Sequence, residues 1–245
     1  MNVNWGSTQS AILIGADQCR GGWVVARSDP SLETVRVVVV DSISPVIDVI
    51  ERGDAIACLD VPIGLSPVEP RRCDLEARRF LGSPRSSSVF PPPCRAALSA
   101  RSYEEASRLN QEATGRKISL QSYGIIPAIR EVDEVMEPAL QARIREFHPE
   151  VTFAVLSGRG RGLEERKKSR AGVEERRALL RNVLPEVDHG SIRSEYGSRV
   201  VGIDDILDAL AGLVTAFRIT NGEAQVFPEG EPETDDRGLR MEIVA

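Results

Sequence analysis

The 245-residue sequence is poor in long apolar runs. None reaches the roughly 18 residues of a membrane span, and the longest candidate, Val35–Val40, has the length of a strand. The opening residues, MNVNWGSTQS, lack the charged and apolar regions of a signal peptide. The four cysteines lie far apart and form no Cys-x-x-Cys pair. These absences argue against a membrane protein and a structural zinc site, and they favour a reduced, cytoplasmic setting.

Histidine and aromatic residues are also scarce. His148 and His189 are the only histidines, so nucleophilic catalysis by a Ser-His or Cys-His pair would depend on one of them. His148 stands before Pro149, which is typical of a packing or turn residue. Aromatic residues make up 4 % of the chain, so no platform for stacking nucleic-acid bases is evident. The net charge of −6 argues against binding nucleic acid by bulk electrostatics, and carboxylates become the first candidates for chemistry.

Hydrophobic patterning and turn residues predict an α/β chain. Three strands with short links (11–16, 23–27 and 35–40) suggest an antiparallel meander, and a helix over 45–52 before a strand over 55–59 allows a parallel crossover. Further helices are predicted over 74–81, 102–115, 151–156, 173–184 and 204–219, with strands over 144–147 and 239–244 and an extended, proline-rich loop over 83–93. We expect one domain over 1–245, a helical and loop insertion over about 62–143, and an acidic loop over 229–236.

Two aspartates follow predicted strands in the same way. Asp17 and Asp60 each come after an apolar strand and before turn residues. If the two strands are neighbours, both carboxylates meet at one edge of the sheet, where α/β proteins favour ligand sites. The alternative is that each aspartate caps its own turn through a local hydrogen bond.

A third carboxylate belongs to the helix predicted over 204–219. Its apolar stripe places Asp208 on the flank, beside a strip of small residues that includes Ala211 and Gly212 and allows close approach of another element. Asp204 and Asp205 lie in the first turn, where acids also complement the helix dipole. Carboxylates held close together repel, so their pKa values rise unless a cation neutralises them. Mg²⁺ and Mn²⁺ are the hard ions that suit such oxygen ligands, and two ions about 4 Å apart can promote phosphodiester cleavage.

Six sequence strings then point to a family. GADQCRGGW, ACLDVPIGL, RRCDLEARRFLG, SSSVFPPPCR, REFHPEVTF and DDILDAL, in this order, resemble the DUF429 family, described as predicted nucleases of the RNase H-like fold. In such nucleases the metal ligands lie at the end of the first strand, at the end of the fourth and on the last helix, places that Asp17, Asp60 and Asp208 match. Asp205 resembles the paired helix aspartate of RuvC-type resolvases. Glu146 is a candidate fourth ligand, and Glu150 is its rival.

Basic residues gather in two segments, 71–95 and 159–170, each with six basic residues against two acidic ones. Either could contact phosphates, since guanidinium groups match phosphate geometry, although solvated surface is the alternative. Arg20, close to Asp17, and Lys168, before a predicted helix, are the favoured substrate contacts. Ser86–Ser88 and Gln121 are further loop candidates.

The resemblance implies an RNase H-like mixed five-stranded sheet flanked by helices. It also implies a divalent-metal-dependent nuclease that uses one or two Mg²⁺ or Mn²⁺ ions on DNA or RNA, with Asp17, Asp60, Asp205, Asp208 and Glu146 as catalytic acids. The first four of these acids would be the metal ligands. One alternative is a non-catalytic binding or scaffold protein with a structural ion site. Another is an actin-like or sugar-kinase-like phosphotransferase, but that predicts a duplicated domain and glycine-rich phosphate loops, and the sequence has neither.

Overall fold

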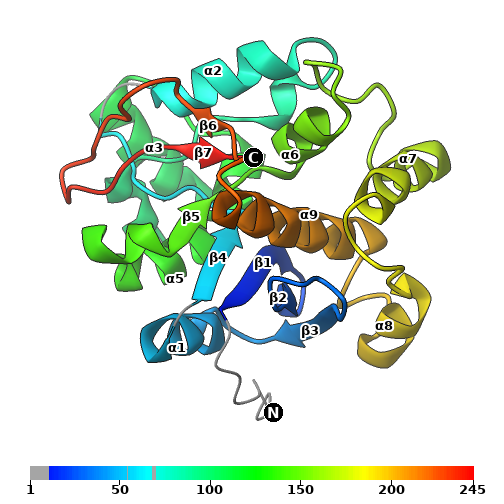
Figure 1. Cartoon of the computed structure of the whole chain (residues 1–245). Coiled ribbons are helices and arrows are strands. Elements are labelled where there is room, and N and C mark those ends of the chain that lie inside the picture. The colour runs from blue at the N-terminus through cyan, green and yellow to red at the C-terminus, as the bar shows by residue number, and fades with distance from the viewer. Residues whose placement is uncertain (1–10, 54, 68–69) are drawn as a thin grey trace.

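The structure, a computed structural model, describes residues 11–53, 55–67 and 70–245 (Figure 1). The strands are β1 (Ile12–Cys19), β2 (Gly22–Ser28), β3 (Arg36–Val40), β4 (Ala55–Leu59), β5 (Ile144–Glu146), β6 (Val226–Phe227) and β7 (Ile243–Val244). The helices are α1 (Ser44–Arg52), α2 (Arg72–Leu81), α3 (Tyr103–Thr114), α4 (Leu120–Gly124), α5 (Ile126–Val135), α6 (Pro149–Leu156), α7 (Arg170–Arg181), α8 (His189–Tyr196) and α9 (Ile203–Thr220). Short 3-10 turns cover Ser86–Ser88, Arg95–Ser99 and Pro138–Ala142.

One mixed sheet of five strands organises the chain, in the order β3-β2-β1-β4-β5. The pairs β1–β2 and β2–β3 are antiparallel, whereas β1–β4 and β4–β5 are parallel. The tight turn between β1 and β2 depends on Gly22, whose φ of 116° suits glycine. The crossover through α1 makes β4 parallel to β1. The predicted α/β class and mixed five-stranded sheet are confirmed, and the strand order agrees with an RNase H-like fold.

The sheet is buried on both faces because alternate residues of its strands enter two different cores. Ile14 and Ala16 of β1 pack in the core that includes buried residues of α1, α3 and α5. Leu13 packs in the core built around α9, with apolar residues of α6, α7 and α8. Figure 1 shows α9 lying across the sheet beside β1 and β4. Side chains at odd-numbered positions of β1 therefore face α9.

Some boundaries differ from the sequence prediction. The strand expected over 239–244 is wrong: only Ile243–Val244 forms β7, which pairs with β6. The backbone amide of Arg240 donates to the Gln141 side chain and that of Met241 to the Glu233 carbonyl, so these residues take loop partners. Helices α4, α5 and α8 went unpredicted; α8 starts at a capping aspartate, Asp188, whose side chain accepts from two backbone amides.

The residues between β4 and β5 contain α2 to α5. Buried residues of α3 and α5 join the core on the α1 side of the sheet, and α2 packs with α6 and the β6–β7 pair. The domain division, with an insertion over 62–143, stays a prediction. In the acidic loop, the buried Asp235 carboxylate pairs with Arg95. No helix in the described part of the chain is long and apolar enough to cross a membrane.

Candidate functional site

Asp17 and Asp60 lie side by side because of the register between β1 and β4. Ala16 pairs with Leu59, and the Asp60 amide donates to the Ala16 carbonyl at 2.9 Å. Parallel pairing stops at Ala16, while antiparallel pairing of β1 with β2 continues to Cys19. Asp17 therefore lies inside β1, directly after the part of the strand that pairs with β4, and not after the end of the strand as predicted.

Helix α9 brings Asp208 to the same place through a very close contact with β1. A Cβ atom added at Gly15 would lie 2.0 Å from the Leu213 backbone nitrogen, and one at Gly212 would lie 2.9 Å from the Gly15 Cα. Only hydrogen atoms fit at these two positions, so the helix and strand touch through their backbones. This confirms the close approach predicted from the small-residue strip. Asp208 lies one turn before Gly212, and its side chain is 1 % exposed.

The three carboxylates perturb one another. Burial, followed by repulsion from Asp60 and Asp208, raises the pKa of Asp17 well above its ordinary value. Burial also raises the pKa of Asp60. The pKa of Asp208 rises to about 7 because burial and the charge of Asp60 outweigh a neighbouring lysine. Within the described residues, the Asp208 Oδ1 atom is buried and has no hydrogen-bond partner.

The neighbouring lysine is Lys167, which sequence reasoning passed over in favour of Lys168. Lys167 Nζ donates to Asp208 Oδ2 at 2.8 Å and lies 3.9 Å from Asp204 Oδ2. Although burial disfavours its ammonium, the charges of Asp208 and Asp17 raise the pKa of Lys167. Lys168 is 77 % exposed and lies 3.3 Å from Asp204 Oδ2. The two lysines are adjacent in a loop with no periodicity, so no sequence signal distinguishes them.

Asp205 has a capping role. Its Oδ2 atom accepts from the Gly202 amide at 2.8 Å, which is the capping-box contact at the start of α9. Burial raises the pKa of Asp205, and the Gly202 hydrogen bond opposes that rise. Asp204 instead faces the two lysines. The alternative that Asp205 stabilises the start of α9 therefore accounts for its position. Asp205 also lines the cleft that holds Asp17 and Asp208.

Glu146 and Glu150, the rival fourth ligands, are both buried and both paired with arginine. Arg71 donates to the two Glu146 oxygens at 2.8 and 2.7 Å, and the Ile63 amide donates to one of them at 2.7 Å. Arg176 donates to Glu150 Oε1 at 2.6 Å, whereas Glu150 Oε2 has no hydrogen-bond partner among the described residues. The charge of Glu150 also raises the pKa of Asp60 and of Asp208. Glu150 Oε2 lies 3.8 Å from Arg85 Nε without a hydrogen bond, so it is more available than either Glu146 oxygen.

These side chains border a cleft of about 410 Å³, which we name the acid cleft. Its lining includes Asp17, Asp60, Glu146, His148, Glu150, Lys167, Asp205, Asp208 and residues 87–90. A second, wider space of about 680 Å³ adjoins it and shares Gln18 and Asp205 with it. This space, the basic hollow, is lined by Arg20, Lys168 and Arg199. The predicted substrate contacts Arg20 and Lys168 therefore lie beside the acids.

The basic segment 71–95 mostly serves the fold. Arg71 is buried between Asp74 and Glu146, Arg85 donates to the carbonyls of Leu163 and Glu164, and Arg95 pairs with Asp133, Asp235 and Asp236. Arg78 also donates to the Val89 carbonyl and Arg72 lies 3.6 Å from Glu76, so five of its six basic residues have partners within the protein. Ser87, Ser88 and Gln121 line the acid cleft. His148 contacts the Ser88 carbonyl at 3.3 Å.

No group of three or more His, Cys, Asp or Glu side chains within 11–53, 55–67 and 70–245 is arranged to hold a metal ion as the side chains stand. The donor set nevertheless suits a hard divalent ion in its chemistry. It consists of buried carboxylates with raised pKa values and an Asp208 oxygen without a partner. An ion on the unpartnered Asp208 Oδ1 would share this carboxylate with Lys167, whose ammonium donates to Oδ2.

Comparison with known proteins gives one match. A family model described as "Protein of unknown function (DUF429)" matches residues 15–233. No curated protein and no solved structure is similar to the chain by these comparisons. The match runs from within β1 into the acidic loop and includes every residue of the acid cleft except Ile243.

Proposed function

We propose, starting from the membership of this chain in the DUF429 family, that it is a divalent-metal-dependent nuclease acting on phosphodiester bonds of nucleic acid. One observation carries the proposal: Asp17, Asp60 and Asp208, from β1, β4 and α9, converge at the edge of a sheet with one lysine to offset them. Such repulsion costs stability, which a fold without a use for these acids would avoid by substitution.

Asp17, Asp60 and Asp208 would hold one or two Mg²⁺ or Mn²⁺ ions, with Asp205 and either Glu146 or Glu150 as further candidates. When bound, such ions activate water and stabilise the leaving oxygen. The protein's own residues supply the rest. Lys167 keeps a positive charge in the lining of the acid cleft, where it would offset charge on a phosphate as well as on Asp208.

The basic hollow gives a path for the neighbouring phosphates. Arg20 and Arg199 are exposed and make no ion pair with the residues that the structure describes. Lys168 is also exposed and could exchange Asp204 for a phosphate oxygen. Arginine and lysine bind the nucleic-acid backbone without reading sequence, so these three residues would position the strand. DNA and RNA are both compatible with this arrangement.

A purified-protein assay with Mg²⁺ or Mn²⁺ against single-stranded DNA, duplex DNA, RNA and hybrid substrates tests the proposal. The Asp17→Asn Asp60→Asn variant should lose cleavage yet melt at or above the temperature of the wild type, because it removes mutual repulsion. Asp48→Asn is a matched control, since Asp48 is exposed and pairs only with Arg52 among the described residues. Equal cleavage by the double variant, or none by the wild type on any substrate, would overturn the proposal.

The second candidate is a non-catalytic binding protein with a structural ion site. The contact between Lys167 and Asp208 favours it, because the lysine already offsets the buried charge without a metal. Calorimetric titration with Mn²⁺ alongside the cleavage assay separates the two. Binding with cleavage supports the nuclease, whereas binding without cleavage of any polymer supports the second candidate.

A further inference from the structure

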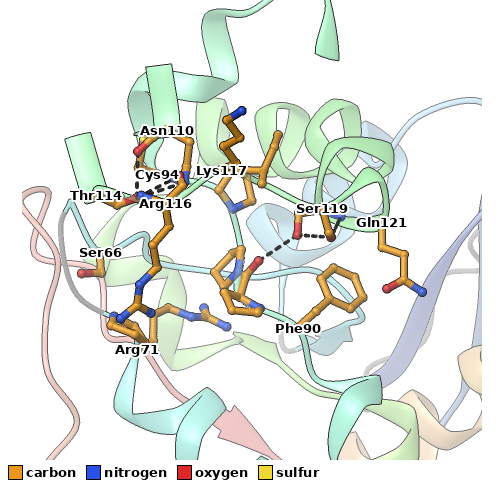
Figure 2. Close-up of a pocket in the computed structure, with 16 residues that line it drawn as sticks. Ser66, Arg71, Phe90, Cys94, Asn110, Thr114, Arg116, Lys117, Ser119 and Gln121 are labelled. Atoms are coloured by element: carbon orange, nitrogen blue, oxygen red, sulfur yellow. Dashed lines mark hydrogen bonds between the residues drawn. The ribbon is translucent and has the colours of Figure 1, made fainter. Parts of the chain in front are cut away.

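A third space adjoins the acid cleft. It measures about 250 Å³ and lies between Phe90–Cys94 and the connection from α3 to α4, as Figure 2 shows. We name it the proline pocket, after Pro91, Pro92 and Pro93 in its wall. It shares Arg71, Phe90 and Gln121 with the acid cleft, so the two spaces adjoin.

The walls of the proline pocket are fixed by hydrogen bonds. Ser122 Oγ donates to the Pro91 carbonyl at 3.0 Å, and the Cys94 amide donates to Asn110 Oδ1 at 2.8 Å. The Asn110 amide group in turn donates to the Arg116 carbonyl at 2.8 Å. The proline segment is therefore held at both ends, and a ligand would meet a formed pocket instead of having to order one.

The lining combines an aromatic ring with an unpaired cation. Phe90 is half-buried and stands at the junction with the acid cleft. Arg116 is exposed and forms no ion pair within the described residues. In Figure 2 the Arg116 side chain extends along the wall toward Arg71, while Lys117 points outward. The charge of Arg71 is already offset by Asp74 and Glu146, so Arg116 is the cation open to an anionic ligand.

These features fit one nucleotide. A flat base can stack on Phe90 and on the proline rings, and Arg116 can pair with its phosphate. The volume is below the roughly 300–1,000 Å³ of pockets for drug-sized ligands, which suits a single base and excludes a duplex. A base inside a duplex is stacked and paired, so its face is not available to a side chain. Only an unpaired strand offers such a base.

We propose that the proline pocket binds the base of one nucleotide beside the acid cleft, and that the substrate is therefore a single strand. This rests on the proposed nuclease function for the role of the strand, but binding can be measured without catalysis. The strand would run from the basic hollow through the acid cleft to the proline pocket. Residues of α4 line all three spaces: Gly124 the first, and Gln121 the other two.

The test is binding of a fluorescent single-stranded oligonucleotide in EDTA, where no metal-dependent cleavage occurs. The wild type should bind it at least fivefold more tightly than a duplex of the same sequence, and also more tightly than an abasic strand of the same length. Phe90→Leu should weaken binding of the single strand about fivefold or more, as loss of base stacking does, while Phe90→Tyr should retain it. Leucine keeps an apolar side chain, and melting temperatures check that each variant is folded.

Arg116→Gln should weaken binding and lower its salt dependence. Arg36→Gln is the charge-matched control. Arg36 is exposed and lies opposite Arg27 in the register of β2 and β3, at the end of β3 away from Asp17. Equal affinity for single strand and duplex, equal affinity for the abasic strand, or no effect of Phe90→Leu would overturn the inference. Weakened binding by Phe90→Leu in a protein that cleaves nothing would leave the pocket assigned and reject the nuclease. Cleavage that Phe90→Leu leaves unchanged, with unchanged binding, would reject the pocket alone.

Discussion

Replacing Lys167 tests whether the carboxylates of the acid cleft hold a metal. Lys167 Nζ donates to Asp208 Oδ2 at 2.8 Å, so a metal ion would compete electrostatically with this ammonium for the same carboxylate, even if it bound through the unpartnered Oδ1. Charge-assisted hydrogen bonds contribute about 1.5–3 kcal/mol. Because the Lys167 side chain is 40 % exposed, water screens the pair, and the low end of that range applies. We therefore expect Lys167→Gln to bind Mn²⁺ about tenfold more tightly than the wild type, which corresponds to about 1.4 kcal/mol.

The same substitution should have the opposite effect on the metal-free protein. Asp208, whose side chain is 1 % exposed, loses its cation, so the free energy of unfolding should fall by about 1–2 kcal/mol. Saturating Mn²⁺ should restore most of that loss, since a tenfold gain in affinity adds about 1.4 kcal/mol of stability. At roughly 2–4 °C per kcal/mol for a chain of this size, Mn²⁺ should raise the melting temperature by about 3–6 °C more in the variant than in the wild type.

Calorimetric titration in metal-free buffer and thermal melting with and without Mn²⁺ measure both effects. Lys168→Gln is the matched control, because Lys168 is 77 % exposed and contacts Asp204 instead of Asp208. Its Mn²⁺ affinity should change by less than about threefold, as expected for an exposed pair. If Lys167→Gln bound Mn²⁺ no more tightly than Lys168→Gln, the competition between Lys167 and a metal ion for the Asp208 carboxylate would be refuted. If neither variant nor the wild type bound Mn²⁺, the metal site itself would be refuted.

Two further predictions concern stability. Gly15→Ala should lower the free energy of unfolding by about 3 kcal/mol or more, because its Cβ would lie 2.0 Å from a backbone nitrogen of α9. Urea unfolding measures this, with Gly53→Ala as the control, since a Cβ at Gly53 meets nothing within 4 Å; equal midpoints would contradict the close packing. Burial opposes the ionisation of Asp235, but hydrogen bonds from Arg95 and backbone amides outweigh it and lower the pKa of Asp235. An aspartate whose pKa is lowered by folding stabilises the fold at pH values above the pKa of an unfolded aspartate, about 3.9. That stability is lost as the pH falls through the lowered pKa. The wild type should therefore lose its advantage over Asp235→Asn between about pH 5 and pH 3 in urea midpoints, and a constant difference would contradict this.

The sequence was sufficient to place the three central acids because each belongs to a regular element. Asp17 lies in β1 directly after the part that pairs with β4, and Asp60 directly follows β4; the crossover through α1 makes these strands parallel neighbours. Asp208 is fixed by the helical period, which puts it on the same side as Gly212. Periodicity of 2 or 3.6 residues thus determines which way these side chains face.

The partners of those acids could not be predicted, because they come from segments without a period. Arg71 reaches Glu146 across 75 positions of the sequence, and a buried arginine there looks the same as a solvated one in a run of basic residues. Lys167 and Lys168 are neighbours in a loop, and only the direction of each side chain decides that Lys167 contacts Asp208 and Lys168 contacts Asp204. Phe90 stands in a proline-rich loop, where its composition indicates an extended chain but not the pocket it borders.

Which basic side chains have partners inside the fold also affects how the net charge of the protein is interpreted. A net charge of −6 argues against a nucleic-acid partner only if the charges are spread evenly. In the structure, Arg71 and Arg95 of segment 71–95 offset buried acids, while Arg20, Arg199 and Arg116 border the two spaces that adjoin the acid cleft without an ion pair among the described residues. A phosphate chain would meet the local field of these arginines, because surface charges farther away than about 10 Å are screened at moderate salt. The acidity of the whole chain therefore decides little about its partner.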